Sequence, residues 1–244
     1  MKKPTLVLTA VTVLALAGCA DSSEGDSQAI TVFAAASLQP AFDDIIEQFH
    51  HAHEGALTVE TVYDGSSTLI TQLAEGASVD VLATANEDTM DQAHADDLLV
   101  EDPEVFATNE LVMATREDAP TVPDSLAQVS EFSYAICAAE VPCGQATVEL
   151  FDQNDLSLAP ISEETSVTAV ANRITEGEVE VGFIYTTDVA ARPELQAVPI
   201  DGQPVINTYP IAPTSQSPAA KEFVDFVLAN AGQEILAEHG FGSK

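Results

Sequence analysis

The chain has no tryptophan and very little positive charge. Its 244 residues include 7 Lys and Arg against 40 Asp and Glu, which gives a formal net charge of -33. Because nucleic acids bind to basic surfaces, this balance argues against a nucleic-acid partner. The acids are spread along the whole chain rather than clustered. Such a distribution is typical of a solvated surface, which can also serve a protein in a salty medium. A cation site would instead need clustered acids.

Cysteine is also scarce, with three residues at positions 19, 137 and 143. In an exported chain, the closely spaced pair Cys137 and Cys143 favours a disulfide. The alternatives are a metal site or a nucleophile. A zinc site would need two further ligands nearby, and the nearest histidines in the sequence are His94 and His239.

The N-terminal segment has the pattern of an export signal. Lys2 and Lys3 precede an apolar run, residues 5–17, that is short for a bilayer span. The run ends in Leu16-Ala17-Gly18-Cys19, which resembles the lipobox of bacterial lipoproteins. This resemblance implies removal of residues 1–18 and a lipid on Cys19, anchoring the protein on the extracytoplasmic face of the cell membrane. An ordinary secretory signal is the alternative. Residues 19–28 are small and polar and predict a flexible tether.

Short apolar strands alternate with amphipathic helices along the rest of the chain, which predicts an α/β fold with parallel strands. Ser37 and Asn86 are expected to cap the helices that follow them. The predicted strands cover residues 30–35, 57–63, 79–83, 134–137, 179–185, 195–200 and 205–209. The predicted helices cover residues 38–49, 69–75, 87–95, 144–151, 167–174, 219–228 and 233–239.

Two apolar extended runs, residues 111–114 and 205–211, could carry the chain between two lobes. In that interpretation residues 112–206 form one lobe. Residues 29–111 and 207–244 form the other lobe, so that both ends of the chain contribute to it.

Small or hydroxyl residues recur where a predicted strand gives way to a helix, in residues 30–38, 62–69, 141–144 and 165–167. A helix N-terminus presents unpaired N–H groups and the positive end of the helix dipole. Several such ends meeting at one cleft would bind an anion without Lys or Arg. The sequence therefore indicates an anion site built from uncharged donors.

Six segments, in this order along the chain, resemble those of the molybdate-binding proteins of bacterial ABC importers, over about residues 29–242. They are Phe33-Ala-Ala-Ala-Ser-Leu38, Gly65-Ser-Ser-Thr-Leu69, Asp80-Val-Leu-Ala-Thr84, Val141-Pro-Cys-Gly144, Gly182-Phe-Ile-Tyr185 and Tyr209-Pro-Ile211. The resemblance implies a two-lobe type II periplasmic-binding-protein fold, with mixed or parallel sheets flanked by helices and a ligand cleft between the lobes.

The same resemblance implies a tetrahedral oxyanion ligand, molybdate or tungstate, held by neutral donors. Ser37 and Ser66 would give their hydroxyls, Cys143 and Val167 their backbone N–H groups, and Tyr185 its phenol. Cys143 stands where the family often has alanine. No cofactor, and no metal beyond the bound oxyanion, is implied. The protein would be a monomer that serves an ABC permease and its ATPase.

Three other functions remain open from the residues. The same fold could hold another solute, either a sulfate-like oxyanion or a metal ion bound through His50, His51 and His53. An enzyme is disfavoured by the lack of a Gly-x-Ser-x-Gly, zinc-protease or phosphate-loop motif, and would need Cys143 as a free thiol. The third is a structural surface lipoprotein, which would bind no small anion.

Overall fold

The computed structural model describes residues 28–157, 159–200 and 202–243. The predicted signal segment (residues 1–18) and the lipidated Cys19 lie outside the described residues. The predicted tether (residues 19–28) also does, except for its last residue, which begins the first strand.

Within the described residues the strands form one mixed sheet of nine, in the order β2-β1-β3-β9-β4-β7-β5-β6, with β8 also paired to β4. β1 is parallel to β2 and β3, and β5 is parallel to β6 and β7, as the strand–helix alternation predicts. β4 and β9 run antiparallel to their neighbours. The strands are β1 (Gln28–Ala35), β2 (Leu57–Asp64), β3 (Val81–Ala83), β4 (Glu104–Arg116), β5 (Tyr134–Cys137), β6 (Ser162–Glu164), β7 (Val181–Tyr185), β8 (Leu195–Val198) and β9 (Ile206–Pro213).

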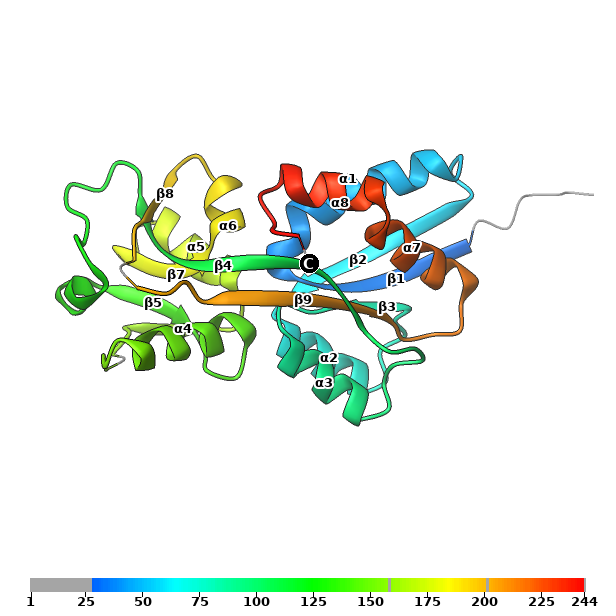
Figure 1. Cartoon of the computed structure of the whole chain (residues 1–244), viewed down its shortest axis with the longest axis horizontal. Helices are drawn as coiled ribbons and strands as arrows, with labels where there is room; N and C mark the ends of the chain where they lie inside the picture. Colours follow the sequence, from blue (N-terminus) through cyan, green and yellow to red (C-terminus); the bar gives the residue numbers. More distant parts are fainter. Residues whose placement is uncertain (1–27, 158, 201, 244) are drawn as a thin grey trace, which may run out of the picture.

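Helices cover both faces of the sheet (Figure 1). Around β1–β3, α1, α7 and α8 lie on one side and α2 and α3 on the other; around β5 and β7, α5 and α6 lie opposite α4. The helices are α1 (Gln39–Ala52), α2 (Ser66–Ala74), α3 (Glu87–Ala95), α4 (Pro142–Gln153), α5 (Val167–Thr175), α6 (Thr186–Ala190), α7 (Pro218–Leu228) and α8 (Asn230–Glu238). Two short 3₁₀ helices are η1 (Ala36–Leu38) and η2 (Leu126–Glu131).

Sequence pattern explains these elements directly. β1 is a nearly continuous apolar run because helices cover both of its faces. In α1, Phe42, Ile45 and Phe49 recur at helical spacing and are fully buried, while Asp43 and Asp44 on the other side are exposed. Asn86 caps α3 as predicted, since its side chain accepts a hydrogen bond from the backbone N–H of Thr89 at 3.1 Å.

β4 and β9 lie side by side through the middle of the molecule and join its two halves (Figure 1). β4 pairs with β9 over residues 104–110 and with β7 over residues 111–115. Each predicted crossing run lies largely within one of these strands, although β4 begins at Glu104, ahead of the predicted run. One hydrophobic core draws only on residues 111–205, and the other two draw on residues before and after that range. The lobe boundaries given above stay a prediction.

Candidate functional site

A small cavity of about 20 Å³ lies where the two halves of the molecule meet. A cavity needs roughly 10–15 Å³ to hold one water molecule. The two halves therefore leave little empty space between them. All five residues named from the sequence line this cavity and are buried: Ser37, Ser66, Cys143, Val167 and Tyr185.

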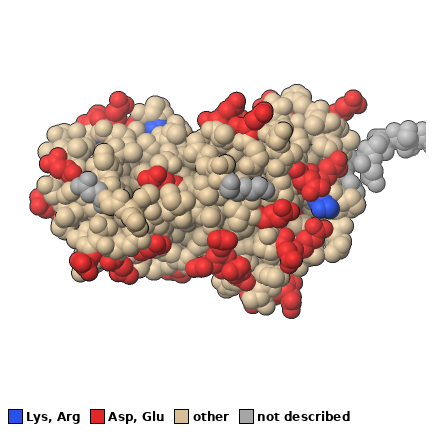
Figure 2. Space-filling view, in the orientation of Figure 1, with Lys and Arg blue, Asp and Glu red and all other residues tan. Residues whose placement is uncertain are grey.

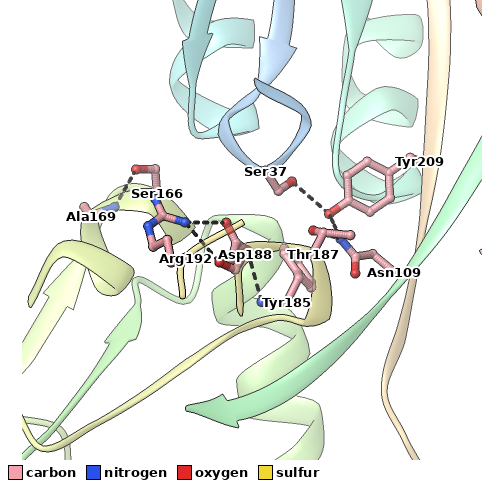
Figure 3. Close-up of polar contacts among 9 residues, drawn as sticks. All are labelled: Ser37, Asn109, Ser166, Ala169, Tyr185, Thr187, Asp188, Arg192 and Tyr209. Atoms are coloured by element: carbon pink, nitrogen blue, oxygen red, sulfur yellow. Dashed lines mark hydrogen bonds and ion pairs between the residues drawn. The ribbon is translucent and has the colours of Figure 1, made fainter. Parts of the chain in front are cut away.

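Ser37 lies in η1, directly after β1, and is 3% exposed. The predicted role of Ser37 as a helix cap is wrong: its side chain caps no helix, and Leu38 occupies the N-cap position of α1. Because η1 intervenes between strand and helix, the hydroxyl turns instead toward β9. There it forms a hydrogen bond of 2.9 Å with the hydroxyl of Tyr209 (Figure 3).

Ser66 is the first residue of α2. Its Oγ accepts a hydrogen bond of 3.0 Å from the backbone N–H of Ala85, which follows β3. A serine oxygen that accepts here keeps its own proton available for another partner. The backbone N–H of Ser66 belongs to the first helical turn and has no partner within the helix.

Cys143 and Val167 present helix N-termini from the other half of the molecule. Cys143 is in the first turn of α4, directly after Pro142, and Val167 is the first residue of α5. Their N–H groups lie at the positive ends of two helix dipoles. A disulfide joins Cys137 to Cys143, so neither sulfur is a thiol that could act as a nucleophile. The bond ties the end of β5 to the start of α4.

Tyr185 ends β7 and is 1% exposed. Burial, together with the neighbouring Tyr209 and Asp188, raises the pKa of its phenol well above 10, so the hydroxyl keeps its proton at neutral pH. The phenol oxygen accepts a hydrogen bond of 3.0 Å from Nδ2 of Asn207 on β9.

No positively charged side chain of the described residues lines the small cavity. The charged residue beside it is Asp64, whose carboxylate accepts a hydrogen bond of 2.7 Å from the backbone N–H of Gly65. Each of the described Lys and Arg side chains lies instead within salt-bridge distance of a carboxylate. Acidic side chains are scattered over the visible face of both halves (Figure 2). The cavity can therefore attract an anion only through hydroxyls, N–H groups and helix dipoles.

Contacts between the two halves surround the cavity. Ser67 Oγ donates a hydrogen bond of 2.6 Å to the backbone carbonyl of Glu140, and Asn86 donates to Gln145. Gly65 packs so closely that a Cβ placed on it would lie 2.0 Å from the carbonyl oxygen of Thr165. The described conformation is therefore one in which the cleft is closed.

Sequence reasoning missed the polar side chains behind the cavity. Asn207 and Tyr209 on β9 are buried and bonded to Tyr185 and Ser37, which line it. Asn109 on β4 is also buried and donates to Tyr209. The sequence did hold a signal for them. Asn207 and Tyr209 stand two apart in a run predicted to be a buried crossing strand. Since polar groups are buried only when they have partners, their presence there indicates polar contacts.

A second cavity, of about 250 Å³, adjoins the first at Ser37. Asp188, Arg192 and His239 are among its lining residues. Asp188 accepts a hydrogen bond from the backbone N–H of Tyr185 at 3.1 Å and lies 3.6 Å from Arg192 (Figure 3). Burial raises the pKa of Asp188 to about 6, although Arg192 and the Tyr185 N–H oppose that rise.

The histidine cluster does not form a metal centre in the structure. His50 accepts a hydrogen bond from the backbone N–H of Val59, His53 pairs with Glu222, and His51 is exposed near Glu47. Throughout the part of the chain that the structure describes, no three His, Cys, Asp or Glu side chains gather as a metal site would require. The same residues also include no helix long and apolar enough to cross a membrane.

The fold and the cavity define a two-lobe binding protein of the type II periplasmic class, with its ligand site between the lobes. The family model for bacterial extracellular solute-binding proteins matches residues 30–242. The chain belongs to that family.

Relatives with known names agree with this assignment. The chain is 38% identical to the molybdate-binding protein ModA of Mycobacterium tuberculosis, over 97% of this chain and 96% of that one. It is 26% identical to the ABC transporter substrate-binding lipoprotein YvgL of Bacillus subtilis, over 98% of each chain. Among solved structures, the substrate-binding domain of a molybdenum ABC transporter from Clostridium difficile is similar, with a TM-score of 0.63 and 25% identity over 89% of this chain and 100% of that one.

Proposed function

We propose that this protein binds molybdate or tungstate outside the cytoplasm and delivers the anion to an ABC importer. The observation that carries the proposal is the convergence of Ser37, Ser66, Cys143, Val167 and Tyr185 on one buried cavity without a positive charge. Uncharged donors suit a fully deprotonated tetrahedral anion, because every oxygen of such an anion accepts hydrogen bonds and none must donate one. The similarity to ModA supports the choice of anion.

Binding would be coupled to closure of the two lobes. The hydroxyls of Ser37 and Ser66 come from one side of the cleft, while Tyr185 and the starts of α4 and α5 come from the other. An anion reaches both sets of donors only when the cleft is closed, so it shifts the population toward the closed form. Selectivity over sulfate would follow from cavity size, since the two anions share charge and geometry.

The protein would work as a lipid-anchored monomer on the extracytoplasmic face of the membrane, serving a permease and its ATPase. The Leu16–Cys19 motif supports the anchor, and the relative YvgL is named a lipoprotein. Mass spectrometry of the protein from membranes tests this point: a diacylglycerol adduct on Cys19 is expected, and an unmodified Cys19 would contradict it.

Isothermal titration of the protein without its predicted signal segment tests the ligand. We expect one molybdate per chain, bound tightly and not displaced by excess sulfate. Folded protein that gives no heat with molybdate would overturn the proposal, and displacement by equimolar sulfate would favour a sulfate-like ligand instead. Triple replacement of His50, His51 and His53 by Gln should leave binding unchanged, because these side chains do not line the cavity.

A further inference from the structure

Two side-chain hydrogen bonds join the halves of the molecule outside the anion cavity. Ser67 Oγ of α2 donates at 2.6 Å to the backbone carbonyl of Glu140, which precedes α4. The side chain of Asn86, the N-cap of α3, donates to the side chain of Gln145 in α4. The helices α2, α3 and α4 lie on the same side of β4 and β9 (Figure 1). None of the four residues lines the cavity, so none is placed to touch a bound anion.

The donor of Asn86 is held in place by its own half of the molecule. Its Oδ1 accepts from the backbone N–H of Thr89 at 3.1 Å, and its carbonyl accepts from the buried hydroxyl of Thr84 at 2.8 Å. Because Oδ1 is used in the cap, Nδ2 is the atom that faces Gln145. These contacts do not cross the cleft, so they persist when it opens. The side chain therefore loses little freedom when it bonds to Gln145.

The Glu140 carbonyl is held in a similar way by the other half. It belongs to the turn between β5 and α4, where the Val141 N–H donates to the carbonyl of Ala138 at 3.1 Å. The Ala138 N–H in turn donates to the carbonyl of Glu164 at 2.8 Å. Both bonds across the cleft can therefore form as soon as the halves meet, and both are lost when the halves separate.

Such bonds affect the closed form alone. They stabilise it whether or not an anion is present, and they must break before the cleft opens. An anion held between the two halves can leave only after that opening, so these bonds slow its release. An anion that enters the open cleft does so before the bonds have formed, so they leave its association rate unchanged.

We propose that the Ser67–Glu140 and Asn86–Gln145 bonds form a latch that sets how long the closed protein retains its anion. The inference rests on the proposed function and extends it to residues that do not contact the ligand. The net contribution of one hydrogen bond between uncharged groups corresponds to a change in rate of roughly three- to tenfold. The two bonds together would lengthen retention by the product of their separate effects.

Substitutions on either side of the Asn86–Gln145 bond test the latch. Asn86→Ser keeps a good N-cap on α3, but the serine side chain is too short to reach Gln145. Gln145→Ala removes the acceptor. Each protein is loaded with radioactive molybdate, mixed with excess unlabelled molybdate and collected on filters, which gives the dissociation rate. We expect each variant to release molybdate roughly three- to tenfold faster than the parent.

The double variant distinguishes a shared bond from general damage to the two helices. Asn86→Ser combined with Gln145→Ala should release molybdate no faster than the faster single variant, because both changes remove the same bond. Combining Asn86→Ser with Ser67→Ala should multiply the two effects, because these changes remove different bonds. The Kd from isothermal titration should rise by the same factor as the dissociation rate, so that the association rate, their quotient, is unchanged.

Gln153→Ala is the matched control. It removes an exposed amide from the end of α4, where Gln153 donates to Glu149 of the same helix. This variant should release molybdate as the parent does. Circular dichroism and thermal melting establish that each variant is folded.

Dissociation rates of Asn86→Ser and Gln145→Ala equal to that of the parent would overturn the latch. Effects that multiply in their double variant would also overturn it, because the two residues would then act separately. A parent protein that retains no molybdate would overturn the proposed function, and this inference with it. The two kinds of failure are therefore distinguishable in one series of measurements.

Discussion

Gly65 and Thr165 touch backbone to backbone across the cleft: a Cβ on Gly65 would lie 2.0 Å from the carbonyl oxygen of Thr165. Gly65 has φ -59° and ψ 135°, a conformation open to any residue. Its lack of a side chain is therefore required by the neighbour and not by the local backbone. The contact joins the end of β2 to the start of α5, so it exists only while the cleft is closed.

Gly65→Ala should prevent the cleft from closing fully and weaken molybdate binding at least tenfold. The ligand-free protein should stay folded, because the open cleft admits the methyl group. Titration calorimetry and urea unfolding measure the two effects. Gly55→Ala is the control for affinity, since no atom of the rest of the chain lies within 4 Å of a Cβ placed there, although the φ of +75° at Gly55 means that this variant should lose some stability. Undiminished affinity in Gly65→Ala would mean that binding does not need this degree of closure.

Ser66→Ala removes one hydroxyl donor from the cavity. Hydrogen bonds to charged groups contribute roughly 1.5–3 kcal/mol, so molybdate affinity should fall about 10- to 100-fold. Thr71→Ala, which removes an exposed hydroxyl from the same helix, should bind as the parent does. Equal affinities for the two variants would remove Ser66 from the ligand set.

Replacing both Cys137 and Cys143 by Ser removes the disulfide, which closes a short loop with a sequence separation of 6. Loop-closure entropy predicts a loss of roughly 2 kcal/mol in the free energy of unfolding, measured by urea titration. Molybdate affinity should change by less than about threefold, because only the backbone N–H of residue 143 is expected at the anion. A large loss of affinity with stability intact would show that the Sγ atom of Cys143, or the disulfide that it forms, matters to the site.

Asp188 should give the ligand-free protein a pH-dependent stability. Burial raises its pKa from 3.8 to about 6, so the folded chain holds this proton more tightly than the unfolded chain. The stabilisation is complete below pH 3.8 and is lost as the pH rises through 6. The free energy of unfolding of the parent minus that of Asp188→Asn should fall by about 2 kcal/mol between pH 4 and pH 7.

Urea titrations of the two proteins at several pH values give this difference directly, and the remaining carboxylates cancel because both proteins share them. If the free-energy difference between the two proteins does not change between pH 4 and pH 7, Arg192 fully offsets the effect of burial on the pKa of Asp188.

The fold was predictable from the sequence because its local signals agree. Apolar runs of strand length, amphipathic helices and residues such as Asn86 indicate the same α/β alternation. The antiparallel pairing of β4 and β9 with their neighbours was not predictable from those signals, since pairing direction depends on where a long connection brings a strand back.

The candidate site was predictable as far as its residues are next to helix starts. The unpaired N–H groups of a first helical turn indicate the junctions that hold Ser66, Cys143 and Val167, whereas the choice of these individual residues comes from the family resemblance. Ser37 was placed in the cavity but with the wrong local role, because a 3₁₀ turn separates β1 from α1. Asn109 and Asn207 could not be connected to the site, since their contacts depend on the register between two strands that are remote in sequence.

The crystal structure of the tungstate complex, with the anion located by its anomalous scattering, tests the central claim most directly. We expect tungsten in the small cavity, with its oxygens within hydrogen-bond distance of Ser37 Oγ, Ser66 Oγ, the Tyr185 hydroxyl and the N–H groups of Cys143 and Val167. Tungsten in the larger cavity beside Arg192 and His239 would contradict the account, because the anion would then be held by charge.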